Sequence, residues 1–186
     1  SVVDFFSEYF EEVLPLFENF PKTFLDNPAG KLATVYADHW QYNNQYCLIG
    51  DAAHAVVPFL GQGMNASFED CEILIKCLDE AQGKWSNVYN KYCSIRKENS
   101  DAIAKMAIEN YVEMRDLVTR KEFIQQKEIS NILTELFPNR FIPRYNMVSF
   151  TSIPYSEVYR RGELQQQIIK DINPENPDME LAEKLI

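Results

Sequence analysis

The sequence predicts an α+β fold, with a few short strands followed by a mostly helical C-terminal region. One observation is the stretch 46–78, in which an apolar run, an acidic residue, a loop with proline and glycine and an amphipathic helix follow one another. Another is the helical spacing of apolar residues in most of the chain after residue 85. We therefore divide the chain into residues 1–82, which hold the strands and the loop, and residues 83–186, which are chiefly helical.

The first predicted element is an amphipathic helix that ends near Pro15. Aromatic and aliphatic residues recur at helical spacing over residues 2–14, with glutamates on the opposite side. A proline-rich loop follows it as far as Gly30.

A hairpin is predicted next. Residues 32–38 and 46–49 have the small, β-branched and aromatic composition of strands, and residues 40–45 form the turn between them. Asn43 and Asn44 suit this turn because asparagine tolerates left-handed backbone geometry.

The second strand ends at Gly50 and Asp51, and an uncharged loop over residues 52–63 leads to a helix that begins near Asn65. We expect one side of this helix to be buried and the other to face solvent. The side expected to be buried contains Met64, Phe68, Cys71, Ile75 and Leu78, and the solvent side contains Glu69, Glu72, Lys76 and Asp79.

In the second part, Gly83 breaks the helical pattern. Helices are predicted over residues 85–96, 100–119, 121–136 and 155–170, with Ser100 as the N-cap of the second. Pro138 and Pro143 predict an extended segment that continues to about Ile153, and the acidic tail from Asp171 is expected to be loose until Leu181.

Composition excludes several partners. A net charge of −10 argues against nucleic acid and against a polybasic membrane patch. The four cysteines lack zinc-ligand spacing, so we expect buried free thiols in a reducing compartment and no metal site. The longest uncharged run, 52–68, contains His, Pro, Gln and Asn and is therefore not a membrane span.

The segment Gly61-Gln62-Gly63-Met64-Asn65-Ala66 matches the dinucleotide fingerprint GxGxxG/A. That motif must lie in the tight turn directly after its strand, whereas here a loop intervenes and no acidic residue follows on a second strand. We reject the match as a Rossmann fingerprint.

The whole stretch LIGDAAHAVVPFLGQGMNASFEDC is much more specific. It resembles the second flavin-binding segment of FAD-dependent aromatic hydroxylases, and its segments VPFLGQGMN and FEDC are most similar to the kynurenine-hydroxylating members. The later segments ENYVEMRD (109–116) and FPNRFIPRYNMVSF (137–150) carry the same resemblance, which thus covers about residues 31–150.

The resemblance implies an NADPH- and FAD-dependent monooxygenase that uses O2 to hydroxylate L-kynurenine at ring carbon 3. The chain begins at Ser1 and lacks the fingerprint that the family carries near its N-terminus. We therefore expect the C-terminal part of a longer enzyme, without the N-terminal Rossmann part and unable to hold FAD well alone. In this interpretation residues 1–82 end the FAD- and substrate-binding region and residues 83–186 line the substrate pocket. The family also implies a membrane anchor outside this sequence and the cytosolic face of the outer mitochondrial membrane.

Asp51 is the foremost candidate for cofactor binding. A carboxylate at a strand end can accept hydrogen bonds from ribose or a polyol, or it can bond to nearby loop N–H groups. The resemblance favours the first role, with contact to the ribityl–pyrophosphate part of FAD. It also implies a flavin contact from the loop and the following helix start, where unpaired N–H groups favour negative charge on a reduced flavin. The residues concerned are Pro58, Gly61, Gly63, Met64 and Asn65.

Substrate-binding candidates come from the same loop and from the second part. Asn110 is the polar member of an apolar helical stripe, so its amide must bond either to the backbone or to a ligand. The resemblance assigns Asn110, Met114 and Tyr145 to the kynurenine pocket and places Phe59 beside the substrate ring. Leu60 departs from relatives that carry an aromatic residue or histidine there. His54 lies between alanines and is expected to be structural, and no side chain is predicted as a catalytic acid or base.

Two alternatives remain open at this stage. The substrate could be a phenol or another aromatic acid, or the chain could be a non-catalytic helical interaction module with a vestigial flavin loop.

Overall fold

The computed structural model describes residues 1–172, apart from the side chain of Ser86. The chain forms two compact units, Ser1–Leu32 and Ala33–Ile186, the second of which is described as far as residue 172. The described part is mostly helical with one small sheet, as the sequence predicts. The predicted loose tail from Asp171 lies almost entirely outside the described residues.

The first unit contains α1 (Val2–Tyr9), a 3₁₀ turn at Leu14–Leu16 and α2 (Phe20–Asp26). Ser1 caps α1 through a capping box with Asp4. The predicted end of the first helix near Pro15 is wrong, because α1 stops at Tyr9 and Pro15 lies inside the 3₁₀ turn. The region predicted as a loop contains α2. No residue of this unit is buried, although Phe6 contacts the rings of Phe5, Phe10, Phe20 and Phe24.

The only sheet of the described chain is the hairpin of β1 (Gln41–Tyr42) and β2 (Tyr46–Cys47). Asn43 and Asn44 adopt positive φ values of 50° and 55° in its turn, as their residue type suggests. The strand predicted at residues 32–38 does not form. A strand needs a partner, and this segment makes one backbone hydrogen bond, from Val35 N–H to the carbonyl of Ala55, rather than a ladder.

The predicted loop between the hairpin and the central helix contains α3 (Asp51–His54) and a 3₁₀ turn at Pro58–Leu60. The helix α4 (Gly63–Glu80) then begins two residues before the predicted start, with Gln62 as its N-cap. Gly83, at φ +74°, ends the helical region through its N–H bond to the carbonyl of Leu78.

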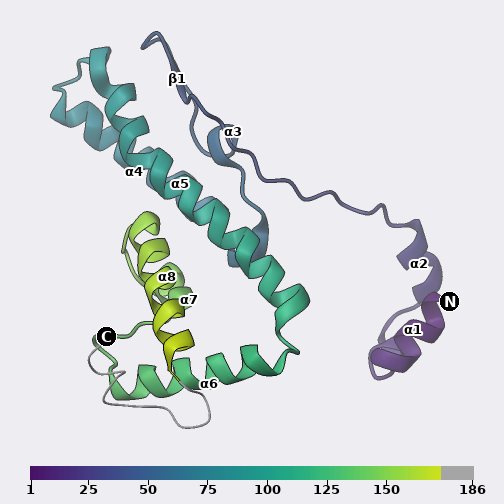
Figure 1. Cartoon of the computed structure of the whole chain (residues 1–186). Helices are drawn as coiled ribbons and strands as arrows, with labels where there is room; N and C mark the ends of the chain where they lie inside the picture. Colours follow the sequence, from purple (N-terminus) through teal and green to yellow (C-terminus); the bar gives the residue numbers. More distant parts are fainter. Residues whose placement is uncertain (173–186) are drawn as a thin grey trace. The chain divides into compact units, whose positions relative to one another are not determined.

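The long helix α5 (Val88–Val112) is the centre of the second unit (Figure 1). It begins after a 3₁₀ turn at Trp85–Asn87 and continues into a π-helical turn at Glu113–Leu117. The prediction of two helices here was wrong: Ser100 is no cap but a fully buried residue within α5. Asn99 stays helical because its side chain donates to Ile95 O and accepts from Ser156 of another helix.

The remaining helices are α6 (Lys121–Leu136), α7 (Arg144–Phe150) and α8 (Tyr155–Asp171). The first and last confirm the prediction, whereas α7 replaces most of the predicted extended segment because Pro143 precedes the first turn of a helix. The helices α4 and α8 pack on α5 and α7 packs on α8, and together they form the main apolar core. This core contains Ala66, Ala102, Ile103, Met106, Met147, Val148, Tyr155 and Val158.

Candidate functional site

The Gly50–Asp51 turn is held against the first turns of α4. Gly50 adopts φ 58° and ψ −142°, and a Cβ added there would lie 3.2 Å from Ser67 Oγ. Its carbonyl accepts the N–H groups of Ala53 and His54 and so starts α3. Asp51, the first residue of α3, is exposed to solvent. The turn therefore lies against the first turns of α4 and carries one exposed acidic residue.

The start of α4 is the second part of this site. Gly63, Met64 and Asn65 form its first turn, where backbone N–H groups have no partner within the helix. Gln62 Oε1 accepts hydrogen bonds from the Asn65 amide and from Tyr155 Oη, at 3.0 Å each, which ties this turn to α8. Met64 and Asn65 are exposed, and no atom lies within 4 Å of a Cβ placed on Gly61. Open space, unpaired donors and an exposed carboxylate thus occur in one stretch, 51–65, and they fit a polar cofactor.

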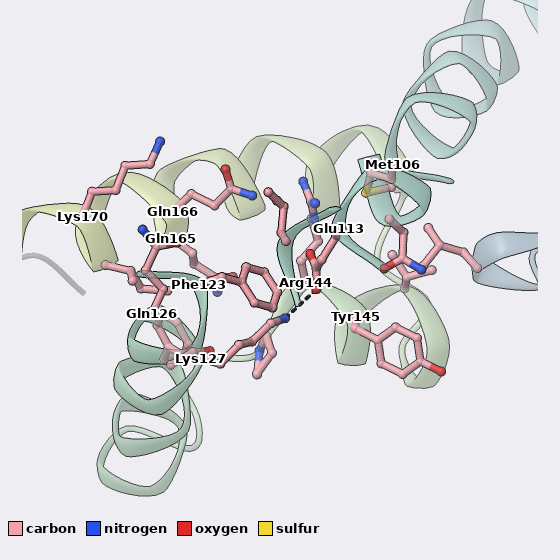
Figure 2. A pocket seen from close by; sticks show the side chains of 18 residues that line it. Met106, Glu113, Phe123, Gln126, Lys127, Arg144, Tyr145, Gln165, Gln166 and Lys170 are labelled. Atoms are coloured by element: carbon pink, nitrogen blue, oxygen red, sulfur yellow. Dashed lines mark ion pairs between the residues drawn. The ribbon is translucent and has the colours of Figure 1, made fainter. Parts of the chain in front are cut away.

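A cleft of about 340 Å³ lies between α5, α6, α7 and α8. Figure 2 shows Tyr145 and Met106 towards one end and Lys170 with Gln166 at the other. Lys127 Nζ lies 2.9 Å from Glu113 Oε1 across the cleft. Its apolar walls include Leu60, Leu117, Phe123, Phe141, Val148 and Ile169.

The cofactor candidates and the cleft are joined through the 3₁₀ turn Pro58–Leu60. Leu60 lines the cleft, and the amide of Asn110 donates to Phe59 O at 2.9 Å. The Phe59 ring packs on Tyr111 with 4.6 Å between centroids. The loop before α4 is therefore fixed directly to α5.

The four predicted substrate residues are placed as follows. Asn110 and Tyr145 line the cleft, and Tyr145 lies in α7 rather than in an extended segment, with its side chain exposed. Met114 does not line the cleft, but its sulfur lies 3.5 Å from the Asn110 amide nitrogen. Phe59 does not line it either. Its carbonyl accepts a hydrogen bond from the Asn110 amide, which is the backbone bond that the sequence analysis gave as one alternative for Asn110. Pro58 is exposed one residue earlier.

A buried ionic network that the sequence did not predict lies behind the turn. Asp70 is fully buried in α4 and accepts hydrogen bonds from Gly50 N–H, from Arg96 Nε and from His54. Burial alone would raise the pKa of Asp70, but hydrogen bonds from His54, Arg96 and Gly50 outweigh it and lower the pKa. Burial, followed by the charge of Asp70, raises the pKa of neighbouring Tyr92.

The cysteines are free, but only Cys77 is buried. Cys71 is exposed, which contradicts the expectation of four buried thiols, and Cys47 and Cys93 are half-buried. Burial raises the pKa of Cys47 to about 12. Among residues 1–172, no cluster of His, Cys, Asp and Glu has the arrangement of a metal site, and no helix is long and apolar enough to cross a membrane.

Comparison of the sequence with known proteins finds a matching family model and related enzymes. Residues 19–107 match the family described as FAD binding domain. Kynurenine 3-monooxygenase of Cytophaga hutchinsonii is 44% identical over 96% of this chain and 39% of its own length. The enzymes of that name from Dictyostelium discoideum and Myxococcus xanthus are each 39% identical, over 100% and 98% of this chain. Over nearly its whole length the chain is thus similar to enzymes named kynurenine 3-monooxygenase. It spans 39–45% of the length of these three relatives.

The stretch 51–65 lies wholly within the residues that match the family described as FAD binding domain. The sequence missed Asp70 and Arg96. Their only signal was a pair of opposite charges on two neighbouring predicted helices, and Asp70 belonged to neither the apolar set nor the solvent-facing set predicted for its helix.

Proposed function

We propose that this chain is part of an FAD- and NADPH-dependent monooxygenase that hydroxylates L-kynurenine to 3-hydroxykynurenine with O2. The observation that carries the proposal is the connection between the two sites. The stretch 51–65 matches an FAD-binding domain, and it is tied through Phe59 to the cleft lined by Asn110. A cofactor and an aromatic substrate bound at these places would be neighbours.

The flavin end of the site has three contributions from this chain. Asp51 would accept hydrogen bonds from hydroxyl groups in the ribityl–pyrophosphate part of FAD, and exposed Pro58 and the open space at Gly61 would admit the flavin beside the loop. The N–H groups of Gly63, Met64 and Asn65 stabilise negative charge on the pyrimidine side of the ring. Bound FAD, once reduced by NADPH, supplies the oxygen chemistry.

The substrate end orients the ring and excludes water. The apolar walls of the cleft accept an aromatic ring, and Asn110 and Tyr145 provide polar contacts to fix its orientation. Asn110 already holds Phe59 O, so it also keeps the flavin loop at its place beside the cleft. The aromatic amine of kynurenine activates the neighbouring ring carbon, so no side-chain base is required.

We further propose that the catalytic unit includes an N-terminal part of the same enzyme. Exposed apolar surface supports this. Large aromatic side chains of the first unit are about half exposed, and Met64, Phe68 and Ile75 along one side of α4 are 54–68% exposed. The residues that bind the kynurenine carboxylate and the ADP half of FAD belong to that part. Attachment to the outer mitochondrial membrane stays a prediction that applies only to mitochondrial members of the family.

The test is NADPH oxidation by the full-length protein, with and without L-kynurenine, with the product identified by mass. Kynurenine-stimulated oxidation with 3-hydroxykynurenine formed is the expected result. Stimulation that yields only peroxide would favour another aromatic acid or phenol as substrate. A protein that binds no flavin and oxidises no NADPH would favour the interaction module instead.

Substitutions in the cleft refine the test. Asn110→Ala should raise KM for kynurenine about tenfold, because it removes one hydrogen-bonding group from the cleft and frees the Phe59 carbonyl. Tyr145→Phe should raise it less. Asn99→Ala is the matched control, since Asn99 lies on the same helix and bonds to Ser156 outside the cleft. An Asn99→Ala effect on KM equal to that of Asn110→Ala would contradict the assignment.

A further inference from the structure

The buried carboxylate of Asp70 contacts both ends of the segment that carries Asp51. Asp70 Oδ2 accepts the Gly50 N–H at 2.9 Å, at the start of this segment. The same oxygen lies 2.5 Å from His54 Nε2, at its end. Three residues, among them Asp51, lie between these two contacts. The segment that carries Asp51 is therefore held at both ends by a residue sixteen positions beyond His54 in the chain.

His54 is itself held on two sides. Its side chain is 3% exposed, and its ring stacks on Trp40 with 5.2 Å between centroids. The Asp70 contact fixes the ring within the plane of this stack. Since His54 closes the single turn of α3, fixing the ring also fixes the turn.

Arg96 supports Asp70 from α5. Its Nε lies 2.7 Å from Asp70 Oδ1, its Nη1 lies 2.7 Å from Glu69 Oε2, and its Nη2 donates to Ala66 O at 3.2 Å. The guanidinium is fully buried and always charged, so it needs a buried anion. It therefore keeps the Asp70 carboxylate ionised and aligned, with both oxygens occupied.

We propose that Asp70 is a positioning residue for flavin binding: it acts through Gly50 and His54 to hold Asp51 where the cofactor needs it. Arg96 is the counter-charge that keeps the Asp70 carboxylate ionised and in place. This inference rests on the proposed function, because it takes Asp51 as the flavin ligand. Support on the far side of a ligating group holds it in its productive geometry, and loosening that support weakens binding without touching the ligand.

The experiment measures FAD affinity in the full-length apoprotein by flavin fluorescence, together with thermal unfolding. The variants are Asp51→Ala, Asp70→Asn and the double variant. Asp51→Ala and Asp70→Asn should each raise Kd about tenfold. The double variant should remain close to either single variant, since both remove the same interaction, whereas independent effects would multiply to about a hundredfold.

Cys77→Ala is the control for simple loss of stability. Cys77 is buried in the same helix, in the apolar cluster that also holds Trp40 and Tyr92. The Cys77→Ala substitution should lower the unfolding temperature and leave the Kd for FAD unchanged. If Cys77→Ala raised Kd as much as Asp70→Asn at equal loss of stability, the positioning role would be refuted.

A second pair of variants covers the case in which Asp70→Asn does not fold. His54→Leu removes the hydrogen bond to Asp70, whereas His54→Gln retains a donor. His54→Leu should raise the Kd for FAD more than His54→Gln does, and equal values would refute the inference. A wild-type protein that binds no FAD would instead reject the proposed function itself, and unchanged affinity in Asp51→Ala would reject Asp51 as the ligand.

Discussion

The Gly50→Ala substitution should destabilise the protein more than any other glycine-to-alanine change tested alongside it. Gly50 has φ 58° and ψ −142°, a combination that costs an L-residue about 1–3 kcal/mol. An alanine Cβ would also lie 3.2 Å from Ser67 Oγ and 3.4 Å from Ser67 Cβ, which are tight contacts on a fixed helix. The two effects together predict a loss of about 2–3 kcal/mol in the free energy of unfolding.

Two other glycines separate these effects. Gly83 has φ +74° but no atom within 4 Å of an added Cβ, so Gly83→Ala should cost only the backbone strain, about 1 kcal/mol. Gly30 has open space and no left-handed φ, and Gly30→Ala should change stability by less than about 0.5 kcal/mol. Adding Ser67→Ala to Gly50→Ala should recover little of the lost stability, because it removes the contact with Ser67 Oγ and leaves the backbone strain at residue 50.

The assay is urea unfolding of the apoprotein, with the free energy of unfolding of the wild type compared with those of the four variants. The reasoning would be refuted if Gly50→Ala lost no more stability than Gly83→Ala. It would also be refuted if Ser67→Ala restored wild-type stability, since the cost would then be the contact alone.

Two further predictions concern titration and reactivity. The pKa of Asp70 is lowered in the folded state. The stabilising effect of its carboxylate is therefore fully present above the ordinary aspartate pKa of about 4 and is lost as the pH falls through the lower folded value. The unfolding temperature, measured against pH, should drop at acid pH in the wild type and drop less in Asp70→Asn. Among the cysteines of α4, exposed Cys71 should react with maleimide before buried Cys77, whose pKa is raised by burial, and mass mapping that found Cys77 labelled first would contradict the assignment.

Local patterns in the sequence predicted the elements whose formation depends on nearby residues. The helices α6 and α8 follow the spacing of their apolar residues, and the Asn43-Asn44 turn follows from the conformational preference of asparagine. The residue-by-residue likeness of the stretch 48–71 to flavin hydroxylases was also visible at once, and this stretch lies within the residues that match the family described as FAD binding domain.

The errors arise where distant parts of the chain decide the outcome. The helices predicted at residues 85–96 and 100–119 are one helix, α5, within which Asn99 accepts a hydrogen bond from Ser156 N–H of α8. Composition at residues 32–38 indicated a strand and could not supply a partner for it. The Asp70–Arg96 pair spans 26 positions, and neither residue differs in type from the many charged residues on solvent-facing helix sides.

The helix α4 shows most directly what the periodicity of a helix can and cannot predict. The predicted apolar side is present in the sequence, yet Met64, Phe68 and Ile75 on it are exposed in the described chain. The side that packs on α5 instead contains Ala66, Asp70 and Cys77, which are offset by about half a helical turn. A helix with apolar residues on both sides needs cover on both. The periodicity of the large apolar residues identified only the exposed side of α4. The small residues of the side that packs on α5 gave too weak a hydrophobic signal. That weak side holds the Asp70 carboxylate, which accepts the N–H of Gly50, so the packing of the Gly50–Asp51 turn depends on the side of α4 that hydrophobicity did not single out.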